Sequence, residues 1–163
     1  EGVAEAELDA DVRDTIPRVY FAWSGDAPAG GWPIGKKHGE PFLQGMTDPG
    51  KFPAWLSDPV IGYLVNEFKG SGFRGPLNRY RNFHRDFAAA SRYAGKKIEQ
   101  PALFMAGSAD VGIRMFGRDV EARMRNHFDD LRGFHMIDSA GHWNQQEKPA
   151  ETNKLLIDWL KSL

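Results

Sequence analysis

Apolar residues recur at intervals of three and four positions through the first part of the chain. The positions with this spacing are Leu8, Val12, Ile16, Val19 and Tyr20. Such positions fall on one face of a helix, so the pattern predicts a helix over 3–23. Pro17 lies inside this pattern, where a proline removes a backbone donor and clashes with the preceding turn. We therefore expect a kink or a break near Thr15.

The stretch 24–57 has no hydrophobic period. It is rich in glycine and proline, and it also carries large apolar residues, including Trp32, Phe42, Phe52 and Trp55. An irregular segment of this length is more often a functional loop or a lid than a simple connection. We therefore expect a lid or a functional loop here.

Two more helices are predicted after this loop. Ser57-Asp58-Pro59 supplies a cap residue and a proline for the first turn of a helix that ends at Gly70 or Gly72. The next helix begins at Gly75-Pro76. Its apolar positions share one face, and Tyr80 lies on that face.

The pattern changes after Lys97 to one of alternating strands and helices. Residues 102–106 form a short, continuous apolar run, which is typical of a strand covered on both faces and usually parallel to its neighbour. A helical stretch is predicted over about 118–128, a second strand over 133–137, and a helix from Pro149 onward. This order predicts an α/β fold.

Composition and charge exclude several classes of function. The 163 residues include 21 Lys and Arg against 22 Asp and Glu, a formal net charge of −1, so no positive field is present to hold nucleic acid or an anionic membrane. No apolar run approaches the length of a membrane-spanning helix. The acidic N-terminus shows no targeting signal, and a cytoplasmic location is favoured. The absence of cysteine excludes disulfides, thiolate metal sites and cysteine nucleophiles.

Two polar residues follow the two predicted strands. Asp110 comes shortly after the first strand, and His142 shortly after the second. Because the carboxyl ends of neighbouring parallel strands emerge on the same side of a sheet, we expect the two side chains to meet. A carboxylate bound to one imidazole nitrogen leaves the other nitrogen as a general base. The residues alone also allow each of them to be an exposed polar loop residue.

Tyr80 allows two interpretations from the residues alone. Its hydroxyl can donate to an oxygen that gains negative charge, or it can be a core tyrosine whose hydroxyl bonds to the backbone. The histidines at other positions, His38, His84, His127 and His135, show no metal-ligand spacing. No glycine-rich phosphate loop leads from a strand into a helix. We expect no metal and no cofactor.

Three segments resemble the soluble epoxide hydrolases of the α/β-hydrolase superfamily. Residues 72–82, GFRGPLNRYRN, closely resemble the cap-domain signature of that family. Residues 141–149, GHWNQQEKP, resemble the segment around its catalytic histidine, and residues 2–7, GVAEAE, resemble the start of its cap. The resemblance spans essentially the whole chain. It implies the C-terminal portion of an α/β-hydrolase fold, with the last two parallel strands and their flanking helices, and a mainly helical cap domain.

The resemblance implies a two-step hydrolysis of a small hydrophobic epoxide to a vicinal diol. In that family an aspartate attacks an epoxide carbon while cap tyrosines hydrogen-bond the ring oxygen, and a water molecule activated by a histidine then hydrolyses the ester. Tyr80 matches one cap tyrosine, His142 the general base, and Asp110 the acid that orients it. The positions that match residues near the substrate pocket are Phe83, Val111 and Trp143.

The nucleophilic aspartate of the family and its His-Gly-x-Pro loop belong to the part of the fold before the cap. The chain therefore resembles the C-terminal half of the enzyme, with the cap over 1–97 and the core portion over 98–163. We expect the N-terminal half as a second chain, held noncovalently, because two strands and a cap cannot cover both faces of a sheet. The other cap tyrosine would fall just before Glu1.

Two other functions remain open at this point. The chain can be a non-catalytic fragment or a binding module lined by aromatic side chains, for which the candidates are Trp23, Trp32, Trp55 and Phe52. It can also be a hydrolase similar to the haloalkane dehalogenases. The cap signature argues against that function, because a tyrosine that donates to a ring oxygen has no role in halide release.

Overall fold

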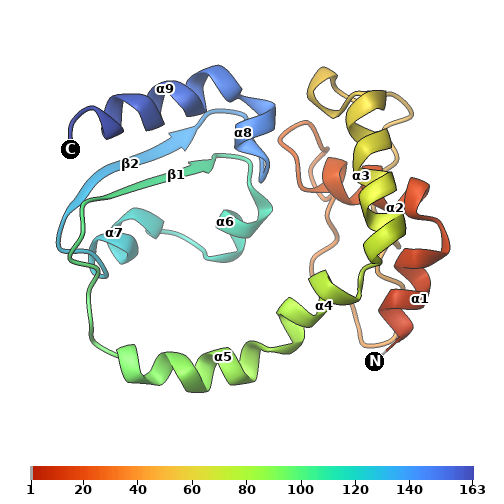
Figure 1. The fold of residues 1–163 in the computed structure, drawn as a ribbon, viewed down its shortest axis with the longest axis horizontal. Helices are drawn as coiled ribbons and strands as arrows, with labels where there is room; N and C mark the ends of the chain where they lie inside the picture. Colours follow the sequence, from red (N-terminus) through yellow and green to blue (C-terminus); the bar gives the residue numbers. More distant parts are fainter. Residues whose placement is uncertain (1) are drawn as a thin grey trace. The chain divides into compact units, whose positions relative to one another are not determined.

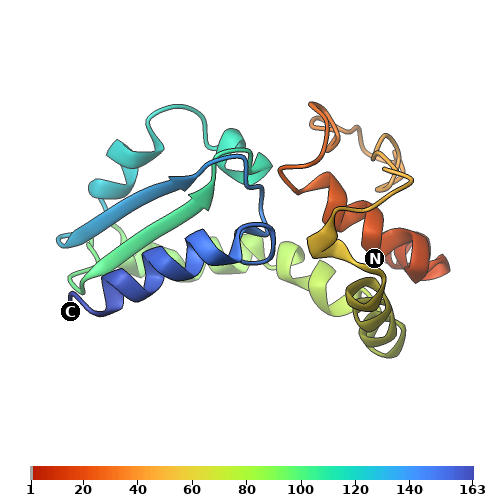
Figure 2. The same ribbon diagram turned by 90° about the horizontal axis from the view of Figure 1, so that it is seen from above.

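The computed structural model describes residues 2–163, which form two compact units. The first unit comprises residues 2–22 and 27–94, and the second comprises residues 23–26 and 95–163. Figures 1 and 2 show helices in the first unit and both strands, with the remaining helices, in the second. The short segment 23–26 therefore belongs to the second unit, although the chain on either side of it belongs to the first.

The first unit is built from helices and one long irregular segment. Its elements are α1 (Val3–Ala10), α2 (Val12–Ala22), the 3₁₀ helix η1 (Ala54–Leu56), α3 (Asp58–Ser71), α4 (Arg74–Arg81), α5 (Phe83–Ala90) and the 3₁₀ helix η2 (Ser91–Tyr93). The glycine- and proline-rich stretch before η1 is irregular, as predicted. α2 packs against α3, and the almost fully buried Ile16, Leu56 and Val65 lie in the core of this unit.

The first helical stretch breaks at Asp11 and not near Thr15, so that prediction was wrong. α1 ends just before Asp11, and α2 begins just after it and runs through Pro17. The Asp11 carboxylate accepts hydrogen bonds from the N–H groups of Arg13 and Asp14, with N···O distances of 3.0 and 3.2 Å. N–H groups in a first turn have no partner within their helix, so this capping by Asp11 favours a helix that begins at the next residue.

The segment predicted as one helix from Gly75-Pro76 forms two helices. α4 carries Tyr80, and α5 begins at Phe83, with Asn82 between them. The rings of Tyr80 and Phe83 still contact each other edge to face, with centroids 6.0 Å apart. The apolar face therefore continues across the break, and Tyr80, Phe83 and Phe87 on it are exposed.

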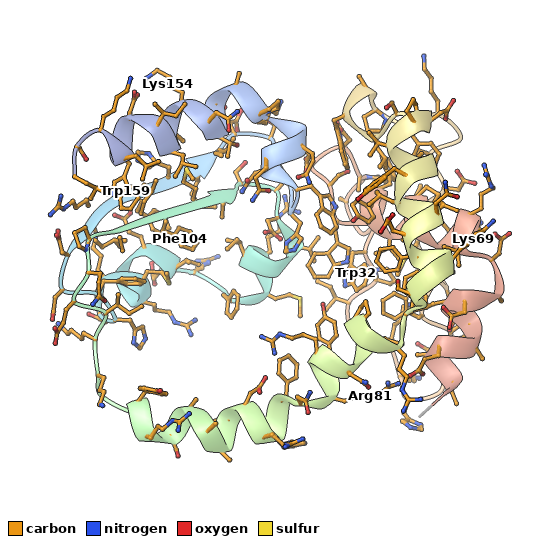
Figure 3. The ribbon with its side chains drawn as sticks, in the orientation of Figure 1. Trp32, Lys69, Arg81, Phe104, Lys154 and Trp159 are labelled. Atoms are coloured by element: carbon orange, nitrogen blue, oxygen red, sulfur yellow. The ribbon has the colours of Figure 1, made fainter. Side chains whose placement is uncertain are left out.

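Carboxylates on α1 bind other parts of the first unit. Glu7 accepts hydrogen bonds from the N–H groups of Phe42 and Leu43, at 2.8 and 2.9 Å. Glu5 forms an ion pair with both terminal nitrogens of Arg81, which lies at the end of α4 (Figure 3). The Arg81 guanidinium, together with backbone donors, lowers the pKa of Glu5 to about 2. α1 thus fixes both the irregular segment and α4.

The second unit contains a parallel sheet with helices on both faces. Its elements are β1 (Ala102–Gly107), α6 (Val111–Met115), α7 (Val120–Arg125), β2 (Leu131–Ile137), α8 (Asn144–Glu147) and α9 (Pro149–Leu160). β1 and β2 are its strands within residues 2–163, and they pair in parallel with Gly107 opposite Ile137. Figures 1 and 2 show α9 on one face of the sheet and α6 and α7 on the other. The predicted order of strand, helix, strand and helix is confirmed, with α6 and α8 as additional short helices.

Aromatic side chains pack on this sheet. The rings of Phe104 and Phe134, on neighbouring strands, stack with centroids 4.8 Å apart. Trp159 points from α9 toward the sheet (Figure 3), and its indole nitrogen is buried. Within residues 2–163, no helix combines the length and the apolar character needed to cross a bilayer.

Candidate active site

The loops that follow β1 and β2 are joined directly by hydrogen bonds. The backbone N–H groups of Ser108 and Ala109 donate to carbonyl oxygens at the end of β2 and in the loop after it, at 2.9 and 2.8 Å. Asp110 lies on the first loop, and His142 lies on the second. The sheet therefore brings the predicted pair to one edge.

Asp110 and His142 are within hydrogen-bonding distance. Oδ2 of Asp110 lies 3.1 Å from Nδ1 of His142. Asp110 is also the N-cap of α6, because its Oδ1 accepts a hydrogen bond from the Gly112 N–H at 2.7 Å. The Asp110 side chain is 11% exposed and the His142 side chain is 43% exposed. The carboxylate is thus held inside the unit while the imidazole reaches its surface.

This contact determines which nitrogen of the His142 imidazole carries the hydrogen. An ionised carboxylate can only accept, so Nδ1 of His142 carries the hydrogen and Nε2 of the neutral ring is the basic nitrogen. Burial tends to raise the pKa of Asp110, but the hydrogen bonds from His142 and Gly112 outweigh burial and hold that pKa below its ordinary value. Asp110 is therefore ionised in neutral solution and can stabilise an imidazolium.

Two indole rings lie edge-on to the imidazole. The ring centroid of Trp23 is 4.7 Å from that of His142, with an interplanar angle of 69°. The ring centroid of Trp143 is 4.9 Å away, at an angle of 85°. Together with Asp110, these rings restrict the orientation of the imidazole.

Three successive backbone N–H groups around the histidine are hydrogen-bonded. The N–H groups of Gly141 and Trp143 donate to Oε2 and Oε1 of Glu147, at 2.8 and 3.0 Å. The N–H of His142 itself donates to the carbonyl oxygen of Trp23 at 2.9 Å. Glu147 and the segment 23–26 therefore both hold the backbone of the histidine loop.

The same region brings backbone segments into direct contact. The N–H of Gly25 donates to Oε2 of Glu147 at 2.8 Å. A Cβ atom on Gly141 would lie 2.3 Å from the nitrogen of Gly25, and a Cβ atom on Gly107 would lie 2.2 Å from the carbonyl oxygen of Gly141. Real Cβ atoms essentially never approach so closely, so this packing requires glycine at these positions.

The other predicted residues divide between the two units. Val111 directly follows Asp110 as the first residue of α6, and Trp143 directly follows His142. Tyr80 and Phe83 lie in the first unit, where they contact each other. Among residues 2–163, no group of three or more His, Cys, Asp or Glu side chains could hold a metal ion.

Sequence reasoning did not single out Glu147 or Gly25, and it named Trp23 only as an aromatic residue. The signal that could have found Glu147 is its place in the segment 141–149, five residues after His142. Gly25 has none, since its partner lies 122 positions away in the sequence.

The chain is similar in sequence and in fold to proteins named epoxide hydrolases. Epoxide hydrolase A of Mycobacterium tuberculosis is 34% identical over 167 residues, a match that covers 99% of this chain and 50% of that protein. The crystal structure of epoxide hydrolase A from Mycobacterium thermoresistibile matches with a TM-score of 0.85 and 36% identity, over 98% of this chain and 49% of that one. An epoxide hydrolase from an endophytic Streptomyces matches with a TM-score of 0.90 and 34% identity, over 98% and 49%. No protein-family model matches the chain. The chain thus spans about half the length of these relatives.

Proposed function

Because the chain belongs to the epoxide hydrolases of the α/β-hydrolase superfamily, of which it represents a C-terminal portion with cap helices, we propose that it takes part in the hydrolysis of an epoxide to a vicinal diol. In this proposal the first unit serves as the cap and the second as part of the hydrolase core. The substrate is a small hydrophobic epoxide, and water is the second reactant. The chemistry needs a nucleophilic carboxylate, a hydroxyl donor and a base, which are all protein side chains.

In the proposed first step, an aspartate outside these 163 residues attacks one epoxide carbon. The bond between that carbon and the ring oxygen breaks, and Tyr80 donates its hydroxyl hydrogen to the oxygen as negative charge develops there. The product is an alkyl ester of the aspartate. Support comes from the exposure of Tyr80 and from its neighbour Phe83, whose ring offers an apolar surface for the substrate.

In the proposed second step, Nε2 of His142 takes a proton from a water molecule while the water oxygen attacks the ester carbonyl carbon. The bond between that carbon and the alcohol oxygen then breaks. Water contributes its oxygen to the carboxylate. One of its hydrogens goes to the departing alcohol oxygen and the other restores the hydroxyl hydrogen that Tyr80 gave up, so the carboxylate and the tyrosine are both regenerated and no further reactant is needed. Asp110 acts through His142, because it keeps a hydrogen on Nδ1 and stabilises the imidazolium. Val111 and Trp143, next to these residues, are proposed to line the substrate site.

The observation that carries the proposal is the contact of 3.1 Å between Asp110 and His142. Two unrelated loop residues would not explain why the carboxylate is buried, doubly hydrogen-bonded and aimed at one nitrogen of a partly exposed imidazole. Buried carboxylates need such partners, because their charged form is otherwise costly to desolvate. An imidazole held in this way is suited to general-base catalysis.

We further propose that the nucleophile comes from an N-terminal half of the hydrolase, present as a second chain. This chain spans about half the length of its relatives. In the part of the chain that the structure describes, β1 is paired with β2 along one edge. The residues of β1 are apolar throughout, which is typical of a parallel strand whose two faces are covered. The other edge of β1 therefore suits a strand of the N-terminal half.

Trapping the ester tests the proposed reaction. We expect the chain, combined with the N-terminal half, to convert styrene oxide to its diol. His142→Ala should still form the ester but hydrolyse it about 10²- to 10⁴-fold more slowly, because the general base is lost. Mass spectrometry should then show the N-terminal half heavier by the mass of the epoxide. His127→Ala is the matched control, since it removes an exposed histidine of the same unit, and its turnover should equal that of the wild type.

Other results would point to other functions. Rapid turnover by His142→Ala would refute the role of the imidazole. Binding of the epoxide without diol formation, unaffected by Tyr80→Phe or His142→Ala, would indicate a binding module. Turnover of a haloalkane but not of the epoxide would indicate a dehalogenase.

A further inference from the structure

We propose that Glu147 is a positioning residue that holds the His142 imidazole in place through the backbone on both sides of it. This inference rests on the proposed function, in which His142 is the base of the second step. Glu147 is the last residue of α8. Its carboxylate binds no substrate atom in this proposal, and it acts only through the histidine loop.

The first support is the set of N–H groups that Glu147 binds. Oε2 accepts from Gly25 and from Gly141, each at 2.8 Å, and Oε1 accepts from Trp143 at 3.0 Å. Two of these donors belong to the residues immediately before and after His142. One carboxylate therefore fixes the peptide groups on both sides of the histidine.

The second support is a closed circuit of hydrogen bonds. The N–H of His142 donates to the carbonyl oxygen of Trp23 at 2.9 Å. Trp23 is tied back to Glu147 through Gly25, two residues further along the same segment. The carboxylate thus holds the histidine loop directly, and it also holds the segment that binds the N–H of His142 and places the Trp23 ring beside the imidazole.

The chemistry of this position requires a carboxylate. Three N–H donors converge on one side chain, and a carboxylate has two oxygens that both accept and carry no hydrogen. Bonds from N–H groups to a charged acceptor are also stronger than neutral ones. A glutamine of the same size has one accepting oxygen, so its NH₂ group would face at least one of the three donors.

Close packing limits how the site can adapt when Glu147 is replaced. A Cβ atom on Gly25 would lie 2.1 Å from the carbonyl oxygen of Ser139, so the segment 23–26 already touches the histidine loop. The two backbones cannot move closer together, and they can only separate. Separation withdraws the Trp23 carbonyl from His142 and shifts the imidazole away from Asp110.

The proposal therefore predicts an effect on one of the two chemical steps. Hydrolysis of the ester uses His142, and its formation does not. A misplacement of about 1 Å can slow a reaction by about 10²-fold. Loss of the carboxylate should slow ester hydrolysis by up to about that factor and leave ester formation within about twofold of the wild type.

The test compares Glu147→Ala and Glu147→Gln with the matched control Glu151→Gln, which makes the same change at an exposed glutamate in the first turn of α9. The first measurement is the NMR signal of the Nδ1 hydrogen of His142 in the full chain, assigned by its loss in His142→Gln. The second is the rate of ester formation and of ester hydrolysis in single turnovers with the N-terminal half. We expect faster exchange of that hydrogen and slower hydrolysis in Glu147→Ala, a smaller change in Glu147→Gln, and no change in Glu151→Gln.

Two results would overturn the proposal. One is a wild-type signal and wild-type ester hydrolysis in the Glu147 variants. The other is equal slowing of both steps with an unchanged His142 signal, which would mark a general structural role. If Glu147→Ala does not fold, the isosteric Glu147→Gln decides the question. If the wild-type protein turns over no epoxide, the proposed function fails separately, and the NMR measurement alone shows whether Glu147 positions the imidazole.

Discussion

Asp110 is an almost buried carboxylate that its hydrogen bonds keep ionised. Burial favours the neutral acid, but the bonds from His142 and Gly112 more than compensate, and the pKa of Asp110 lies below its ordinary value of 3.8. A group whose pKa is lowered on folding stabilises the fold at every pH above its ordinary pKa. That contribution is lost as the pH falls through the lowered value.

Asp110→Asn should therefore destabilise the chain in a pH-dependent way. At pH near 7 we expect the free energy of unfolding to fall by about 1–3 kcal/mol, because the neutral amide replaces the charge-assisted hydrogen bonds of the carboxylate with weaker neutral ones. The difference from the wild type should shrink as the pH falls below about 4, where the unfolded chain takes up the proton first, and disappear as the pH passes through the lowered pKa of the folded carboxylate. Urea unfolding at neutral and acidic pH measures this difference. A difference that does not change with pH would show that the charge of Asp110 is irrelevant.

Gly141→Ala tests the close packing under the histidine loop. The added Cβ atom would lie 2.3 Å from the nitrogen of Gly25, so the two backbones must separate. We expect the free energy of unfolding to fall by about 1–3 kcal/mol. Gly62→Ala in α3 is the control, because a Cβ placed there would meet nothing within 4 Å apart from its chain neighbours and the backbone of its own helix. Alanine is also favoured over glycine in helices, so this control should be neutral or slightly stabilising. Equal urea midpoints for the two variants would contradict the packing argument.

At the scale of whole elements, the ion pair between Glu5 and Arg81 joins α1 to α4. The pKa of Glu5 falls from 4.5 to about 2, chiefly through the hydrogen bonds from Arg81. The pair therefore stabilises the first unit at every pH above 4.5, and its contribution is lost as the pH falls through about 2. Since α4 carries Tyr80, this link also holds the helix that presents the proposed hydroxyl donor.

Arg81→Met should lower the melting temperature of the chain at neutral pH. The decrease should become smaller as the pH falls from 4.5 toward 2, because the unfolded chain takes up a proton on Glu5 near 4.5 and the folded wild type does so only near 2. Arg79→Met is the control, since the ion pair of Arg79 with Asp86 is largely exposed and exposed pairs contribute little. Calorimetry at several pH values provides the measurement. A loss that stays constant down to the lowest pH would exclude the Glu5 pair as its cause.

The elements also show where periodicity stops being informative. The strands and α9 were predictable, because a short apolar run between breakers and a proline at a helix start are local signals. The break at Asn82 was not, since the apolar spacing continues from Tyr80 to Phe83 across it. The break at Asp11 was also missed. Pro17 is the more conspicuous helix-breaking residue in the sequence, but it lies inside α2, whereas the carboxylate of Asp11 caps the first turn of that helix.

At the scale of the whole molecule, the proposed second chain has a physical consequence. Within the described residues β1 has one strand neighbour, and an apolar strand with an unpaired edge promotes association. We expect the chain alone to self-associate and the chain with its N-terminal half to form a stable one-to-one complex. Native mass spectrometry distinguishes these states. A single soluble species of 18.3 kDa that does not bind the N-terminal half would refute the two-chain arrangement.

The pairing of Asp110 with His142 could be read from the sequence, because both residues follow predicted parallel strands whose carboxyl ends must share one edge of the sheet. The surroundings of that pair could not be predicted from the sequence. Gly25 and Glu147 lie 122 positions apart, and nothing in local spacing or hydrophobic period indicates that they meet. Their contact forms because the segment 23–26 packs within the second unit, although the residues on either side of it belong to the first. Local patterns specify strands, helices and the residues at their ends, whereas a hydrogen-bonded circuit between distant segments exists only once the chain has folded.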